Sequence, residues 1–76
     1  MTFSILTEAP KPPQAFISVY KPIAGWKAIH YWWNPEMGGF WEPWQTGMCA
    51  WETKEQAIED AILWAEAEEL PFYEKK

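Results

Sequence analysis

The sequence predicts an α+β fold in which a three- to four-stranded antiparallel meander is followed by one C-terminal helix packed on one face of the sheet. Three observations carry this prediction. Runs of β-branched and aromatic residues are separated by glycine and proline turns, one capped amphipathic segment follows them, and 76 residues suit one small domain. We expect a proline-rich N-terminal arm over residues 1–14 and a single β-β-β-(β)-α domain over residues 15–76.

The arm is predicted from the density of prolines in the run Ala9-Pro10-Lys11-Pro12-Pro13. Proline fixes the backbone near polyproline II values and donates no N–H, so such a run cannot form a central strand. We expect an extended segment that is either loose or laid along the domain. In the second case its proline rings pack on tryptophans of the sheet, in the same chain or in a neighbouring copy.

Strands are predicted at the β-branched and aromatic runs 15–20, 26–33 and 40–45, with a short fourth extended piece at 48–51. Glycine, proline and asparagine punctuate the segments between them, as expected for turns. Pro43 lacks an N–H, so the third strand should lie at an edge of the sheet or carry a bulge.

The helix is the clearest predicted element. Thr53 and Gln56 have the spacing of a capping box, and Pro71 closes the segment, which gives a helix from residue 54 to about residue 70. The i, i+3, i+4 spacing predicts one narrow apolar stripe facing the sheet, made of Ala57, Ile58, Ala61, Ile62 and Ala65. Phe72 and Tyr73 should fold back on the domain as a clasp.

The charge balance excludes several classes of partner. Eleven acidic residues face six lysines, no arginine is present, and the net charge is −5. Phosphate backbones and anionic lipids are bound by clusters of lysine and arginine, so we expect neither nucleic-acid nor membrane binding. A single cysteine and the lack of a signal peptide favour a cytoplasmic protein.

Nothing in the sequence indicates a catalytic or metal site. His30 and Cys49 are the only residues of their types, and both lie in apolar runs typical of structural side chains. A zinc site needs four ligands, and no paired cysteine or histidine spacing is present. Most carboxylates fall on the predicted helix, where they suit its solvated face. We therefore expect a protein that is not an enzyme and that uses no cofactor or metal.

The seven tryptophans remain as candidates for function. One helix covers only one face of a sheet, so some indoles should stay exposed and mark a contact site, unless the arm covers them. The candidate binding surface is a set of four indoles and one carboxylate: Trp26, Trp32, Trp41, Trp44 and Glu42. A secondary contact strip is predicted at Leu63 and Leu70, which lie one heptad apart and point away from the apolar stripe.

Two functional classes follow from this surface. The first is a non-enzymatic interaction or accessory module that binds a protein partner of unknown identity, or a second copy of the chain. The alternative is a small-ligand binder in which tryptophans stack on a carbohydrate, a planar pigment or a quaternary ammonium group, with Glu42 adding hydrogen bonds. A flat or convex aromatic patch favours the first class, and a concave pocket with convergent polar groups favours the second.

Two resemblances point to the same class. The run Trp51-Glu52-Thr53-Lys54-Glu55-Gln56-Ala57-Ile58, continuing to Trp64-Ala65-Glu66 and Leu70-Pro71-Phe72, resembles the strand-to-helix module of a small accessory subunit of respiratory complex I. The tryptophan-rich middle has no counterpart in that subunit. The whole chain resembles short uncharacterised proteins of cyanobacteria. These resemblances imply a non-enzymatic accessory protein and supply no catalytic residues.

Overall fold

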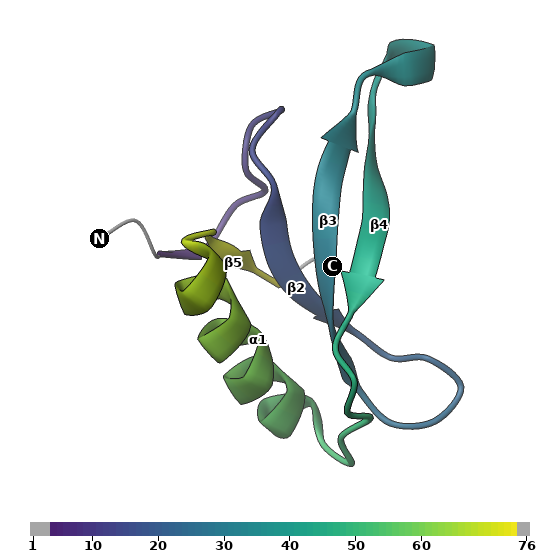
Figure 1. Ribbon diagram of the computed structural model, residues 1–76, viewed down its shortest axis with the longest axis vertical. Coiled ribbons are helices and arrows are strands. Elements are labelled where there is room, and N and C mark those ends of the chain that lie inside the picture. The colour runs from purple at the N-terminus through teal and green to yellow at the C-terminus, as the bar shows by residue number, and fades with distance from the viewer. Residues whose placement is uncertain (1–3, 75–76) are drawn as a thin grey trace.

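The computed structural model describes residues 4–74, which form a five-stranded sheet in the order β1-β5-β2-β3-β4 with one helix on a single face (Figure 1). The central part is the predicted antiparallel meander of β2 (Phe16–Tyr20), β3 (Lys27–Asn34) and β4 (Phe40–Thr46). The α+β class and the C-terminal helix are thus confirmed.

The sheet is wider than predicted, and it is mixed rather than purely antiparallel. Two short strands, β1 (Ile5–Leu6) and β5 (Phe72–Tyr73), pair in parallel with each other, and β5 also pairs in parallel with β2. Part of the predicted arm is therefore an edge strand, and the predicted clasp is the strand beside β2. Two-residue strands are too short to show an alternating pattern, which is why the sequence does not reveal them.

The predicted fourth extended piece at 48–51 does not form a strand. Only Trp51 pairs, through an isolated antiparallel bridge to Trp26 with two N–H···O=C bonds of 2.7 Å. Met48 and Cys49 are exposed, so this piece buries too little apolar surface to be held along a neighbouring strand. Gly25 admits the bridge, because a Cβ there would lie 2.7 Å from the Trp51 carbonyl oxygen.

Pro43 lies where its missing N–H predicts. Strand β4 is the last strand of the sheet, and its register with β3 shifts between His30 and Tyr31, which marks a bulge beside Pro43. Residues Glu36–Gly38 form the short 3₁₀ turn η1 at the tip of the hairpin. Figure 1 shows this hairpin extending well beyond the end of the helix, so its upper part has no helix on either face.

Helix α1 (Lys54–Glu68) begins at the predicted capping box, in which the Gln56 N–H donates to Thr53 Oγ1 and the Thr53 N–H donates to Gln56 Oε1. It ends at Glu68, two residues earlier than predicted, and its C-cap residue Glu69 lies in the left-handed region. Its fully buried positions are all alanines, Ala57, Ala61 and Ala65, so the helix lies close to the sheet. The flanking Ile58 and Ile62 pack against the same core and are partly buried.

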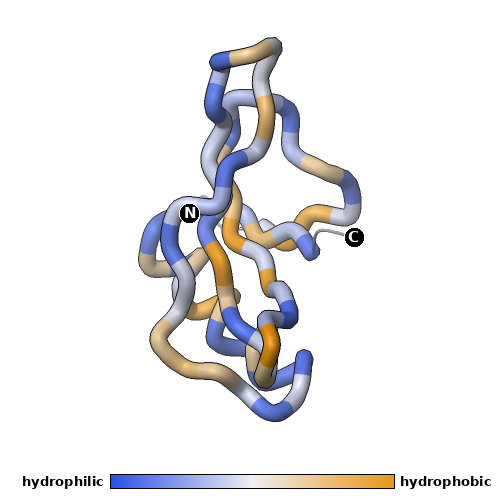
Figure 2. The backbone as a smooth tube through the Cα atoms, turned by 90° about the vertical axis from the view of Figure 1, so that its right-hand side faces the viewer, coloured by the Kyte–Doolittle hydropathy of each residue, from blue (hydrophilic) through white to orange (hydrophobic). Residues whose placement is uncertain are grey.

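The core beneath the helix consists of small and aliphatic side chains together with Phe72. From the sheet it contains Ile17, Val19 and Ala28, all at most 5% exposed. Figure 2 shows the matching pattern along the tube, in which short hydrophobic stretches alternate with hydrophilic ones. In the described part of the chain, no helix has the length and apolar character needed to cross a membrane.

The other face of the sheet carries a separate aromatic cluster. Successive side chains of a strand point to opposite faces, so Phe16 points away from the helix while Ile17 faces it. Phe16 is 1% exposed and lies in ring contact with Tyr31, Trp41 and Tyr73, at centroid distances of 5.2, 5.0 and 5.6 Å. Trp33 extends this group by packing edge-to-face on Trp41 at 5.0 Å. We call these five rings the Phe16 cluster.

Candidate functional site

The structure divides the predicted aromatic surface among three places. Trp41 belongs to the Phe16 cluster on the face away from the helix. Trp26 lies beside the first turn of α1, where Lys54 stands over its ring. Trp32 and Trp44 meet on the helix side of the β3–β4 hairpin, and Glu42 lies opposite Trp32 on the same face.

The helix-side group forms an open hollow of about 270 Å³ lined by His30, Trp32 and Trp44. His30 and Trp32 are two residues apart on β3 and so share one face. The bulge in β4 brings Trp44 to the same side, where its ring meets that of Trp32 edge-to-face at 6.3 Å and 77°. Trp44 is 62% exposed. We call this site the His30 hollow.

Two of the residues that line the His30 hollow each have a polar atom that is shut off from solvent and has no hydrogen-bond partner among the described residues, namely His30 Nδ1 and Trp32 Nε1. A buried polar atom left unpaired costs about 1–3 kcal/mol. Desolvation by burial lowers the pKa of His30, and the charge of Glu68 on α1 partly opposes this effect. The imidazole is therefore held neutral at physiological pH. Native proteins leave few such atoms unpaired, and a functional role is one explanation for those that remain.

Glu42 stands directly opposite Trp32 in the sheet register and shares its face. Its Oε1 accepts a hydrogen bond of 2.9 Å from Asn34 Nδ2. Asn34 is 8% exposed, and its Oδ1 accepts from the Glu36 N–H at 3.0 Å. The carboxylate is thus fixed beside the aromatic walls by a buried amide.

A second hollow continues the first toward the helix. It measures about 400 Å³ and lies between Gln45–Cys49 after the bulge and Asp60 and Trp64 on α1. The two hollows are neighbours, because Gln45 pairs with His30 and the Trp64 ring lies 6.1 Å from the His30 ring. Asp60 is held in place by the Trp51 indole N–H, which donates to its Oδ2 at 3.2 Å.

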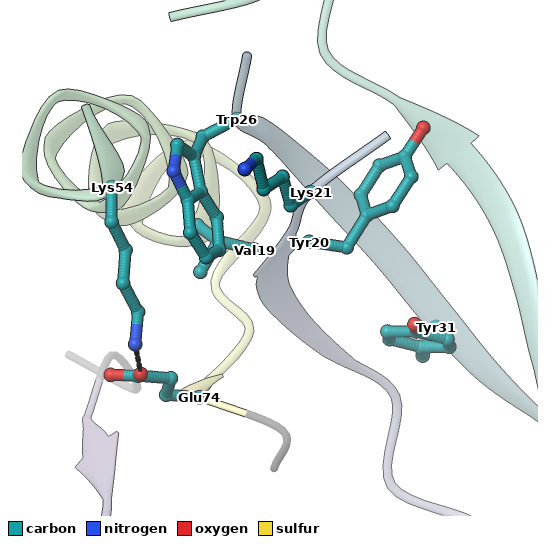
Figure 3. A pocket seen from close by; sticks show the side chains of 7 residues that line it. All are labelled: Val19, Tyr20, Lys21, Trp26, Tyr31, Lys54 and Glu74. Carbon is teal, nitrogen blue, oxygen red and sulfur yellow. Dashed lines mark ion pairs between the residues drawn. The ribbon is translucent and has the colours of Figure 1, made fainter. Parts of the chain in front are cut away.

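Trp26 borders a different pocket, at the end of β2 (Figure 3). This pocket of about 400 Å³ is lined by Val19, Tyr20, Lys21, Trp26, Tyr31, Lys54 and Glu74. Figure 3 shows the Lys54 side chain beside the indole and its ammonium group paired with Glu74. The ammonium nitrogen lies 5.6 Å from the Trp26 ring centroid. The indole face is therefore already occupied by a cation of the same chain.

The predicted leucine strip and the predicted setting of Cys49 both differ from what the structure shows. Leu63 is 67% exposed, but Leu70 packs against the core, so the two do not form one exposed strip. Helix α1 ends before Leu70, which removes the heptad relation between them. Cys49 is exposed rather than buried in an apolar strand, and it borders the second hollow while His30 borders the first.

Two of the three prolines of the arm are not covered by indoles of their own chain. Pro12 and Pro13 are exposed and Pro10 is partly buried. Residues 1–3 of the predicted arm lie outside the described residues. The sequence analysis missed His30 as a site residue, although its alternation with Trp32 on one strand already placed both on the same face. The bulge that adds Trp44 has no sequence signal except Pro43.

No protein-family model matches the chain, and searches of curated proteins and of solved structures found no match either. The resemblances to a complex I accessory subunit and to short cyanobacterial proteins therefore stay predictions. Within residues 4–74, no group of three or more His, Cys, Asp or Glu side chains is placed to hold a metal ion.

Proposed function

We propose that this protein is a non-enzymatic binding module that takes a segment of a protein partner into the His30 hollow. One observation carries the proposal: two of the three residues that line an aromatic hollow each hold a buried polar atom, His30 Nδ1 and Trp32 Nε1, with no partner in the described chain. A bound segment that covers the indoles, and that supplies those hydrogen bonds as the two rings turn toward it, removes an unfavourable desolvation term.

The surroundings of the hollow favour a protein segment. Large apolar side chains stand exposed at it and beside it, namely Trp44 at 62% and Met48 at 99%. Trp44 lines the His30 hollow, and Met48 borders the second hollow. Exposed apolar groups around a pocket are typical of protein contact sites, and tryptophan is enriched among the residues that dominate binding energy.

A small-ligand binder is the second candidate, and the concave shape of the His30 hollow favours it. Two indoles and two unpaired polar atoms are the features of a site that stacks on a ring and orients it by hydrogen bonds. Its ligand would be a carbohydrate or a planar pigment. Such a ligand would use the first hollow alone and leave Met48 uncovered.

Selection from a random peptide display library tests the leading proposal. We expect binders whose affinity is lost with Trp44→Ala and kept with Ile23→Ala, a matched control because Ile23 is 105% exposed and lines none of the hollows described above. In a ¹H–¹⁵N spectrum the indole N–H signal of Trp32, assigned with Trp32→Phe, should shift on binding as it gains an acceptor.

One result of the peptide selection would contradict the proposal. If every selected peptide binds the Trp44→Ala variant as well as the wild type, the hollow is not a protein-binding site. A Trp44-dependent shift of the Trp32 signal with a panel of monosaccharides, but with no peptide, would support the second candidate instead.

A further inference from the structure

We propose that the side chain entering the His30 hollow is cationic, so that the partner segment is basic and carries a lysine or arginine as its anchor. This inference rests on the proposed binding of a protein segment at the same hollow. It follows from the charges around the hollow, from the hydrogen-bonding character of its two unpaired atoms, and from the arrangement of its aromatic walls.

Three carboxylates, from the two elements β4 and α1, lie around the hollow without lining it. Glu42 on β4 faces the same side as Trp32, Glu68 on α1 acts electrostatically on His30, and Asp60 borders the adjoining hollow. None of the lysines within residues 4–74 lines either hollow. Lys21 and Lys54 instead border the pocket at the end of β2. With a net charge of −5 on the whole chain, the field at the hollow attracts a positive group.

The aromatic walls suit a cation as well. The Trp32 and Trp44 rings meet at 77°, so they form a corner rather than a flat stack. Indole faces attract lysine and arginine side chains through the ring quadrupole, and arginine also stacks on them. Glu42 is held beside this corner by Asn34, so the carboxylate is already in place before a ligand arrives.

The unpaired atoms distinguish a basic peptide from other cations. Trp32 Nε1 can only donate, so it needs an acceptor such as a peptide carbonyl. A neutral His30 can accept through Nδ1, and an ammonium or guanidinium N–H is the natural donor for it. A basic residue within a peptide supplies both groups, whereas a quaternary ammonium ion has neither an N–H nor an acceptor.

The test uses the peptides selected on the full chain. We expect lysine or arginine at one fixed position in the binders that depend on Trp44. Replacing that residue by citrulline for arginine, or norleucine for lysine, keeps the shape and removes the charge. The dissociation constant, measured by calorimetry in 150 mM salt, should then rise about tenfold, since both the cation–π contact and the attraction to a nearby carboxylate are lost.

Matched protein variants separate a local effect from the overall charge. Glu42→Gln and Glu55→Gln remove the same charge, but Glu55 lies exposed in the first turn of α1, away from the hollow. We expect Glu42→Gln to weaken binding about fivefold and Glu55→Gln to change it less than about twofold.

Three outcomes are distinguishable. The inference is supported if peptide affinity falls when citrulline or norleucine replaces the basic residue, and also falls in the Glu42→Gln variant. Binders that depend on Trp44 but bind equally well without a cation overturn the inference and leave the proposed function standing. Peptides that bind the Trp44→Ala variant as tightly as the wild type overturn both.

Discussion

Two groups of aromatic side chains lie on opposite faces of the β3–β4 hairpin, and they differ in ring spacing, in exposure and in hydrogen bonding. In the Phe16 cluster, rings meet at 5.0–5.6 Å and the central Phe16 is 1% exposed. At the His30 hollow the two indoles lie 6.3 Å apart, Trp44 is 62% exposed, and two polar atoms are buried without a partner.

The difference teaches that residue type does not assign a role to a tryptophan in this chain. Trp32 and Trp33 are adjacent in sequence, yet one borders the hollow and the other packs in the cluster. Strand alternation separates them, and the bulge decides which side Trp44 joins. A closed cluster contributes stability, whereas an open hollow with unpaired atoms costs stability and is suited to binding.

The largest expected effect comes from the centre of the closed cluster. Phe16→Ala should lower the free energy of unfolding in urea by about 3–5 kcal/mol, because it removes a fully buried ring and leaves a cavity. Phe16→Leu, which keeps most of the volume, is the milder companion if the alanine variant does not fold. A loss below about 1 kcal/mol for the alanine variant would mean that the cluster is not a second core.

A sharper comparison replaces the same residue type on the same strand but on opposite faces. Trp41→Ala should cost about 2–3 kcal/mol, because its ring packs on both Phe16 and Trp33. Trp44→Ala should change stability by less than about 1 kcal/mol, since most of its ring is already in solvent. If thermal melts showed the same loss of stability in both variants, the two faces would not differ in how tightly their rings are packed.

The tip of the hairpin tests how tightly the closed cluster is packed. Gly38 and Gly39 both have a positive φ, at 86° and 93°, so alanine is strained at either position. A Cβ on Gly39 would lie 2.1 Å from the Trp33 ring, whereas a Cβ on Gly38 would meet nothing within 4 Å.

We therefore expect Gly39→Ala to be more destabilising than Gly38→Ala by about 1–2 kcal/mol in urea unfolding, because the Trp33 ring must move away from its partner. The ring contact between Trp33 and Trp41 should report the same displacement as a change in near-ultraviolet circular dichroism. Equal costs for the two substitutions would show that the Trp33 ring shifts freely and that the cluster is loosely packed.

The parts of this structure that the sequence predicts are those that depend on local pattern. Thr53 and Gln56 fix the start of the helix, the alanines at 57, 61 and 65 fix its buried stripe, and Pro43 places β4 at the edge of the sheet. Each of these follows from the chemistry of a few neighbouring residues. The helix and the meander could therefore be predicted without knowledge of the rest of the fold.

The parts that the sequence misses depend on pairing between distant segments. Strands β1 and β5 are two residues long and come from opposite ends of the chain, so neither shows a period. The residues of the predicted aromatic surface lie in separate places for the same reason. Trp26 is covered by Lys54, a residue from the helix, and Trp41 turns to Phe16. The hollow needs a bulge, which is a property of two strands together.

The smallest expected effect concerns the unpaired imidazole, and its sign follows from burial. Desolvation lowers the pKa of His30, so the unfolded chain binds a proton more readily than the folded chain near the ordinary histidine pKa of about 6.5. Stability should then decline as the pH falls through about 6.5, and it should be fully present above that value. His30 is the only histidine in the chain, so no other imidazole contributes in this range.

The free energy of unfolding should be measured between about pH 7.5 and 5.5, a window above that in which carboxyl groups ordinarily titrate. His30 is flanked across the sheet by Ile17 and Gln45, which carry no charge, and Glu68 on α1 opposes the shift without cancelling it. In His30→Gln the same window should be much flatter, because the glutamine side chain does not titrate. A wild-type profile as flat as that of the variant would mean that the imidazole is as well solvated as a free one. The imidazole at the His30 hollow would then not be shielded from water. The hollow would differ from the Phe16 cluster only in the exposure of its rings.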